Sequence, residues 1–218
     1  MANSTIDYNL LYELQDKVLK TIFLEPSEFY LTGGTCLHRF YFAERYSDDL
    51  DFFTHESSTF AYSIREIKTR LSEQFKIENK VETRDFVRFN IYENTQALQL
   101  DFVNDRVQRF GALKSKNKIL LDNPLNILSN KLTAVLARDN PKDIFDIWVI
   151  SRNLTIHWDN ILKEAQMKAH FQKNELIFRL ESFPILLLKQ LNLIGPIKMK
   201  HFKDNLKTII QLIIDSEV

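Results

Sequence analysis

The chain of 218 residues contains little cysteine, little glycine and no long apolar run. Its single cysteine, Cys36, excludes an intrachain disulfide and any cysteine-based zinc site. The N-terminal stretch lacks the basic start and continuous apolar core of a signal peptide. The most apolar run, 183–197, is too short to span a bilayer and is interrupted by Lys189 and two prolines. We therefore expect a cytoplasmic protein with no membrane partner.

The balance of charge and the positions of the histidines exclude further classes of function. Lys and Arg number 29 and Asp and Glu number 29, so no overall bias of charge suggests a partner. The five histidines are scattered, and no pair has the spacing of metal ligands or of a nucleophile with its base. With 44% apolar and 27% charged residues, the composition is that of a globular protein that forms one domain or two small ones.

With only four glycines in the chain, the pair Gly33-Gly34 is informative. It follows a short apolar run and comes directly before a predicted helix, with Thr35 next in the sequence. A glycine turn allows the backbone to approach phosphate oxygens closely. A hydroxyl at Thr35 could donate to the β- or γ-phosphate of a nucleotide. The segment therefore indicates a phosphate-binding turn.

Two carboxylates follow on the next predicted strand. Asp49 and Asp51 alternate with apolar residues, so they share a face of the strand about 6.6 Å apart. Such a pair suits one or two Mg²⁺ ions. Asp101 lies on a later strand between apolar neighbours, and a central position for that strand would bring it into the same cleft as base or metal ligand. The alternative is a set of solvated strand residues.

The C-terminal half carries candidate cations and two further acids. Lys131 and Arg138 lie seven residues apart on a helix predicted over 124–139, hence on one stripe that could neutralise a triphosphate. A solvent-facing basic stripe is the competing interpretation. Asp143 and Asp146 follow in the next helix, where Asp143 could instead stabilise the helix N-terminus. The basic tail 198–207 could contact RNA phosphates or form a solvated helix face.

Periodicity predicts an α+β fold: a mixed sheet flanked by helices in residues 1–121, then a helical domain in residues 122–218. Asn123-Pro124 and Asn140-Pro141 each have the pattern of an N-cap followed by proline at the first helical position. The expected helices are 7–23, 35–45, 59–75, 124–139, one from 141, 158–171, 174–190 and 202–215. The expected strands are 28–31, 50–54, 76–90 and 96–104.

These motifs, read together as GGT, ERYSDDLDFF, LDF and K…R…KDIFDIW, resemble the nucleotidyltransferases of the AbiEii/AbiGii toxin family. That family comprises toxins of bacterial abortive-infection and type IV toxin–antitoxin systems, and the resemblance covers roughly residues 28 to 150. It implies a polymerase-β-like core and Mg²⁺-dependent transfer of NMP from an NTP, with a two-metal site. It further implies an RNA acceptor such as the 3′ end of tRNA, and a cognate antitoxin.

The resemblance also assigns roles to residues of this chain. Catalytic roles fall on Asp49, Asp51, Asp101, Lys131 and Asp143, and metal binding falls on the first three of these. Nucleotide binding falls on Gly33, Gly34, Thr35, Arg45, Ser47, Lys131, Arg138 and Asp146. The chain departs from the family pattern at Cys36, Glu44 and Lys142. Two other functions stay open from the residues: nucleotidyl transfer to a small molecule, and a non-catalytic module that binds NTP or a partner.

Overall fold

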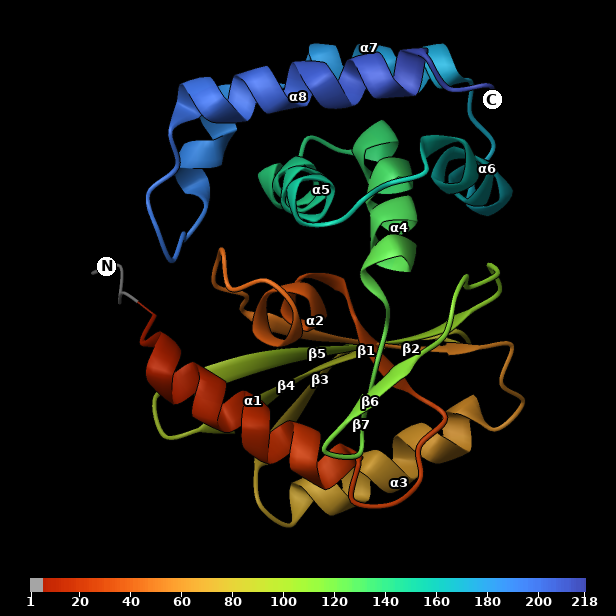
Figure 1. The fold of residues 1–218 in the computed structure, drawn as a ribbon. Coiled ribbons are helices and arrows are strands. Elements are labelled where there is room, and N and C mark those ends of the chain that lie inside the picture. Colours follow the sequence, from red (N-terminus) through yellow and green to blue (C-terminus); the bar gives the residue numbers. More distant parts are fainter. Residues whose placement is uncertain (1–5) are drawn as a thin grey trace. The chain divides into compact units, whose positions relative to one another are not determined.

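A computed structural model describes residues 6–218 (Figure 1). The chain divides into two compact units. Unit 1 comprises the residues up to Cys36 together with Ser47–Arg106 and Leu113–Asp122, and unit 2 comprises Leu37–Tyr46, Val107–Ala112 and Asn123–Val218. The predicted domains 1–121 and 122–218, as separately folding parts, stay a prediction. Helices and a mixed sheet confirm the α+β class.

Unit 1 is built on a seven-stranded sheet in the order β3-β4-β5-β2-β1-β7-β6. Its strands are β1 (Tyr30–Thr32), β2 (Asp49–His55), β3 (Lys76–Glu82), β4 (Phe86–Glu93), β5 (Gln96–Asp105), β6 (Lys114–Lys116) and β7 (Ile119–Leu121). Strands β2 and β5 pair in parallel at the centre, and β4 pairs with β5 antiparallel. The sheet thereby places β5 directly beside β2, as the prediction for Asp101 requires.

Helices α1 (Tyr8–Ile22) and α3 (Phe60–Ser72) cover one face of this sheet (Figure 1). The core between them is aromatic: Phe102 stacks on Phe52 at 4.9 Å and on Phe89 at 5.5 Å between ring centroids, and Phe29 meets it edge-on. Phe52, Phe89 and Phe102 lie on β2, β4 and β5, where buried residues alternate with less buried ones. The period of two therefore turns the apolar face of the sheet toward α1 and α3 and the polar face away from them.

Unit 2 is helical. Its elements are α4 (Pro124–Ala137), α5 (Pro141–Asn153), α6 (Trp158–Lys168), α7 (Lys173–Glu181), the 3₁₀-helix η1 (Ile185–Gln190) and α8 (Met199–Ile214). Asn123 and Asn140 cap α4 and α5 as predicted, since each side chain accepts a backbone N–H of the first turn. Helix α4 packs against α5, α6 and α7 around a buried core. No helix within residues 6–218 is long and apolar enough to cross a membrane.

Several sequence-based boundaries were wrong. The strand predicted over 76–90 is a hairpin of β3 and β4, because Thr83 folds back to accept and donate hydrogen bonds with Phe86. The helix predicted over 35–45 is α2 (Gly33–Phe40), which the N–H groups of Tyr41 and Phe42 close by donating to the Leu37 carbonyl.

Further errors lie in unit 2. The helix predicted over 174–190 ends at Glu181, since Pro184 cannot continue it. The helix predicted over 124–139 ends at Ala137, and Arg138 has an extended backbone. Strands β6 and β7 were not predicted, and they join through Asn117 and Lys118, both with positive φ.

Candidate functional site

A row of polar side chains crosses the sheet of unit 1, on the face turned away from α1 and α3. Strand register places Asp51 of β2 opposite Thr32 of β1 and Asp101 of β5, and it places Asp101 opposite Arg88 of β4. Side chains at directly paired positions point to the same face. We call Asp49, Asp51, Asp101 and Arg88 the acid face.

Asp49 and Asp51 occupy this face as predicted. Both are half-buried, while Leu50 between them is fully buried on the opposite side. The hydroxyl of Thr35, in the first turn of α2, donates a hydrogen bond to the main-chain carbonyl of Asp49. This contact fixes the first turn of α2 beside the start of β2, so Thr35 serves the backbone of the acid strand in this structure.

Gly33 lies directly against the second of these acids. It has φ +69°, and a Cβ built on it would come within 2.4 Å of the Asp51 Oδ2. A side chain at this position therefore meets both an unfavourable backbone conformation and the carboxylate itself. Gly34 follows it, buried in the first turn of α2. The glycine turn thus brings the N-terminus of α2 to the carboxylate pair.

Asp101 has a partner that the sequence did not predict. Arg88 donates from Nε to Oδ1 at 2.7 Å and from its terminal nitrogen to Oδ2 at 2.5 Å, a two-pronged ion pair. The hydrogen bond to Asp101 is the main reason that the pKa of Arg88 is raised, and the charges of Asp51 and Asp49 add to it. The Arg88 guanidinium therefore interacts electrostatically with all three acids.

Two of the three predicted metal ligands, Asp49 and Asp51, have oxygens that fit a divalent cation. Carboxylate oxygens are the ligands that Mg²⁺ prefers, and Asp49 and Asp51 present theirs beside the space that glycine keeps open at position 33. Within residues 6–218 no group of three or more His, Cys, Asp or Glu side chains is arranged to hold a metal ion. Asp101 stands in register with the pair, but its oxygens accept from Arg88.

Ser47 adds a buried hydroxyl two residues before Asp49. Its backbone N–H donates to the Tyr12 hydroxyl at 3.1 Å, and its carbonyl accepts from Gln15 at 3.0 Å. The side-chain oxygen, by contrast, finds no hydrogen-bond partner in the described part of the chain. A buried hydroxyl without a partner is costly, so Ser47 is a candidate contact for a polar ligand.

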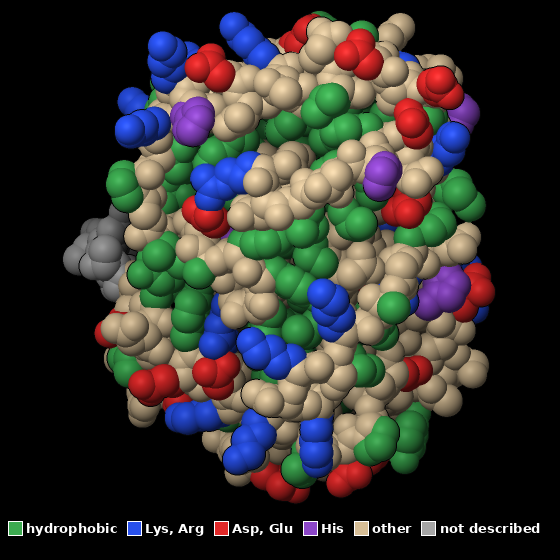
Figure 2. Space-filling view, viewed as in Figure 1, with side chains coloured by type: hydrophobic (Ala, Val, Ile, Leu, Met, Phe, Trp, Pro, Cys, Tyr) green, Lys and Arg blue, Asp and Glu red, His purple; other side chains and the backbone are tan. Residues whose placement is uncertain are grey.

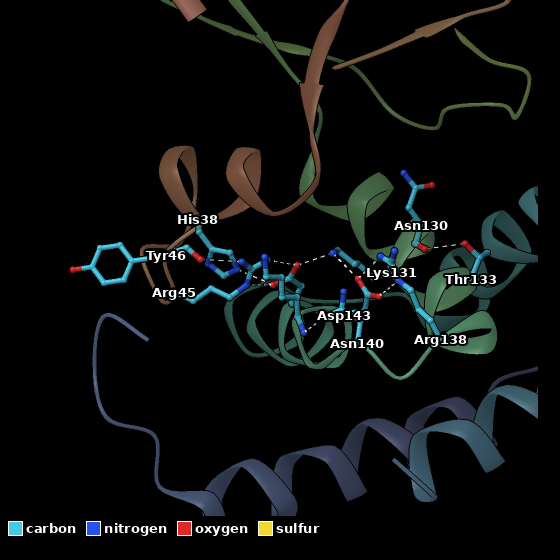
Figure 3. Close-up of polar contacts among 11 residues, drawn as sticks. His38, Arg45, Tyr46, Asn130, Lys131, Thr133, Arg138, Asn140 and Asp143 are labelled. Carbon is cyan, nitrogen blue, oxygen red and sulfur yellow. Dashed lines mark hydrogen bonds and ion pairs between the residues drawn. The ribbon is translucent and has the colours of Figure 1, made fainter. Parts of the chain in front are cut away.

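A second cluster of predicted residues lies in unit 2 and includes Arg45, Lys131 and Asp143 (Figure 3). Its centre is Asp146 of α5. Its oxygens accept from the two prongs of Arg45 at 2.8 and 2.9 Å, lie 2.8 Å from Lys131 Nζ, and lie 2.8 Å from His38 Nε2. Burial alone would raise the pKa of Asp146, but the charges of Arg45 and Lys131 outweigh it and hold the pKa well below its usual range.

Asp143, one turn earlier in α5, is bound in the same way. It accepts from Lys131 Nζ at 2.8 Å and from both prongs of Arg138 at 2.7 and 3.1 Å (Figure 3). Burial again opposes ionisation, yet Lys131 and Arg138 lower the pKa of Asp143. Burial also disfavours the charged form of Lys131, but Asp146 and Asp143 raise its pKa. We call Arg45, Lys131, Arg138, Asp143 and Asp146 the helical cluster.

The helical cluster corrects the expected stripe of Lys131 and Arg138. Arg138 lies beyond the end of α4 in an extended conformation, so the two cations do not share a helical face; they meet instead at Asp143. Arg45, expected to bind nucleotide, is 1% exposed and joins the segment after α2 to α5 through Asp146. Glu44, a departure from the family pattern, accepts from Arg152, whose guanidinium lies over Trp148.

Sequence reasoning missed Arg88 and His38. Alternation in β4, where Val87, Phe89 and Ile91 are buried, could have assigned Arg88 to the polar face, but only register shows that it meets Asp101. No spacing rule connects His38 with Asp146, since their contact depends on tertiary packing within unit 2.

Comparison with known proteins shows what this fold and these motifs belong to. The family model "Nucleotidyl transferase AbiEii toxin, Type IV TA system" matches residues 18–215. An uncharacterized protein of Aquifex aeolicus (strain VF5) is 28% identical over 151 residues, a match that spans 64% of this chain and 64% of that relative.

Two solved structures from Helicobacter pylori share the fold. JHP933 has a TM-score of 0.67 at 18% identity, with 96% of this chain and 92% of that chain covered. A second H. pylori protein, described as a proposed nucleotidyltransferase, has a TM-score of 0.63 at 18% identity, with 96% of each chain covered. The resemblance read from the motifs is thus confirmed, and the chain belongs to the AbiEii nucleotidyltransferase toxin family of type IV toxin–antitoxin systems.

Proposed function

We propose that this protein transfers NMP from an NTP to an RNA acceptor, the 3′ end of tRNA, as a cytoplasmic toxin restrained by a cognate antitoxin. The observation that carries the proposal is the carboxylate pair of Asp49 and Asp51 beside Gly33 at the start of α2. Carboxylates and a helix N-terminus together provide what a metal-bound triphosphate needs. Family membership supports the same reaction.

Each aspartate of the acid face receives a role from its position. Asp49 and Asp51 would hold Mg²⁺, which supplies charge neutralisation for the triphosphate and the leaving pyrophosphate. N–H groups of the first turn of α2, with the hydroxyl of Ser47, bind phosphate oxygens. Asp101, the next acid in register, accepts the proton of the attacking hydroxyl or adds a metal ligand.

The basic exposed side of α8, in unit 2, supports the proposal of an RNA acceptor. Helix α8 buries Phe202, Leu206, Ile209 and Ile213, and its opposite side exposes basic residues. These exposed residues are Lys200, His201, Lys203 and Lys207. Figure 2 shows Lys and Arg side chains and a histidine gathered over the first part of α8. Such a surface binds phosphates without reading sequence.

The helical cluster has a supporting role in this proposal. Lys131 is already neutralised by Asp143 and Asp146, so its binding to a phosphate requires exchange of one carboxylate for another anion. Arg138 is the more accessible cation, with 57% of its side chain exposed. We therefore expect Arg138→Gln to weaken NTP binding, and Lys131→Gln to affect folding stability first.

Labelled NTPs incubated with Mg²⁺, the purified protein and total tRNA test the proposal. We expect label at the tRNA 3′ end, lost in Asp49→Asn and Asp51→Asn. Asp48→Asn is the matched control, because Asp48 accepts a hydrogen bond from the Tyr8 hydroxyl that asparagine also accepts.

The other open functions have distinct outcomes. Label that enters a small-molecule acceptor and not RNA would replace the acceptor in the proposal. Tight NTP binding with no label in RNA, protein or small molecules would make the chain a non-catalytic module. Expression that leaves growth unchanged, although tRNA is labelled in vitro, would refute the toxin role.

A further inference from the structure

The ion pair of Arg88 with Asp101 affects how Asp101 could bind a metal ion. The two side chains are in register on adjacent strands, and both prongs of the guanidinium are used on both carboxylate oxygens. The Arg88 guanidinium is therefore hydrogen-bonded to the same two oxygens with which Asp101 would bind a metal ion. Any cation that binds Asp101 through these oxygens must share them with Arg88 or displace it.

Burial explains why such a partner is needed. The Asp101 side chain is 9% exposed, and a carboxylate at that depth is unfavourable without a compensating cation. The Arg88 side chain is 37% exposed, and its guanidinium lies 5.3 Å from the ring centroid of Phe86. Both residues have their backbone in the sheet, but the longer Arg88 side chain is the more exposed of the two. Of the two partners, Arg88 is the one with room to move.

Charge connects this pair to the rest of the acid face. Asp51 stands beside Asp101 across the β2–β5 register, and its charge and that of Asp49 both act on Arg88. A divalent ion held by Asp49 and Asp51 would bring positive charge to the same neighbourhood. The guanidinium and a second divalent ion would therefore repel each other while they compete for one carboxylate.

We propose that Arg88 is a positioning residue that acts as the built-in counter-cation of Asp101 and competes with a second divalent ion for it. The free protein then binds one divalent ion tightly, at Asp49 and Asp51, and a second binds at Asp101 only when the guanidinium leaves. Departure is favoured when an anion such as a triphosphate offers Arg88 another partner. This inference rests on the cation site of the proposed function.

Counting of bound Mn²⁺ by electron paramagnetic resonance, on the full chain with and without a non-hydrolysable NTP analogue, tests the inference. We expect wild type to bind one tight ion, and Arg88→Gln to bind the second ion about tenfold more tightly, as removal of a neighbouring charge predicts. Arg88→Lys, which keeps the charge but not the fork, is expected to lie between them. Arg106→Gln, which removes a surface ion pair with Asp85, is the matched control.

Thermal unfolding gives a second readout, the rise in unfolding temperature on addition of Mn²⁺, which the loss of a merely structural arginine would not change. Arg88→Gln should unfold at a lower temperature than wild type without Mn²⁺, and saturating Mn²⁺ should stabilise it more than it stabilises wild type. If Arg88→Gln does not fold, Arg88→Lys carries both measurements.

The outcomes separate this inference from the proposed function. Equal second-ion affinity in wild type and both Arg88 variants, with tight binding abolished by Asp51→Asn, overturns the role of Arg88 alone. Mn²⁺ binding that is weak in wild type and unchanged by Asp51→Asn overturns the cation site of the proposed function as well.

Discussion

The acid face and the helical cluster are both built from aspartates and cations, yet they differ in exposure. Asp143 and Asp146 are fully buried, and Arg45, Lys131, Arg138 and His38 surround them. Asp49 and Asp51 are half-buried beside the glycine turn. Buried, compensated carboxylates hold a framework together, whereas half-exposed carboxylates crowded on one face suit a cationic ligand. We interpret the helical cluster as a structural element and the acid face as the site of the proposed reaction.

The largest expected effect is on the helical cluster. Asp146→Ala leaves Arg45 buried without its counter-charge, and we expect the free energy of unfolding to fall by about 3–5 kcal/mol. Urea unfolding followed by circular dichroism measures this. A fully stable Asp146→Ala protein that has lost nucleotidyl transfer would reverse the comparison and make the cluster catalytic.

Asp51→Asn should have the converse effect. We expect transfer of label to tRNA to fall by roughly 100-fold or more, as for removal of a group that stabilises charge in the transition state. The urea midpoint should stay near that of wild type, because asparagine fills the same space on a half-buried strand position. A midpoint lowered as far as that of Asp146→Ala would show that the acid face, too, is a framework element.

Gly33→Ala tests the close approach of the glycine turn to the acid face. A methyl group there meets the Asp51 carboxylate and a backbone with φ +69°, so we expect a loss of about 1–3 kcal/mol in stability. Mn²⁺ affinity should fall with it, because Asp51 must move. Gly195→Ala is the control, since no atom lies within 4 Å of a Cβ built there. Unchanged Mn²⁺ affinity in Gly33→Ala would contradict the contact.

Acid pH separates the two regions in a further way. The pKa of both Asp143 and Asp146 is lowered in the folded state, so their stabilisation is complete above their unfolded pKa, about 3.9. It falls as pH drops below that value and is lost once pH passes the folded pKa. We expect stability to decline more steeply below pH ~4 in wild type than in Asp146→Asn. Urea midpoints measured along a pH series check this, and parallel curves would refute it.

The smallest effect is expected at the surface of unit 2. Asp139 pairs with Arg179 at 2.7 Å, but half of the Asp139 side chain is exposed. We expect Asp139→Asn to change the free energy of unfolding by about 0.2–1 kcal/mol. A loss comparable to that of Asp146→Ala would mean that burial does not explain the stability of the helical cluster.

Local chemistry made part of this molecule predictable from its sequence. Alternation along β2 fixed the shared face of Asp49 and Asp51, and the Asn-Pro pairs fixed where α4 and α5 begin. Such features depend on residues close in sequence. The ion pairs of Arg88 with Asp101 and of Arg45 with Asp146 depend on which distant segments pack together, and no local pattern encodes that.

The parallel pairing of β2 with β5 also has a consequence for when the acid face exists. Parallel strands need a long crossover, here α3, β3 and β4, before they can meet. Pairing of such distant segments is slow, because the chain must close a large loop before the contact contributes. We therefore expect Asp51 and Asp101 to become neighbours late in folding. A nascent or misfolded copy of this toxin-family protein would lack the assembled acid face even though every residue of it had been made.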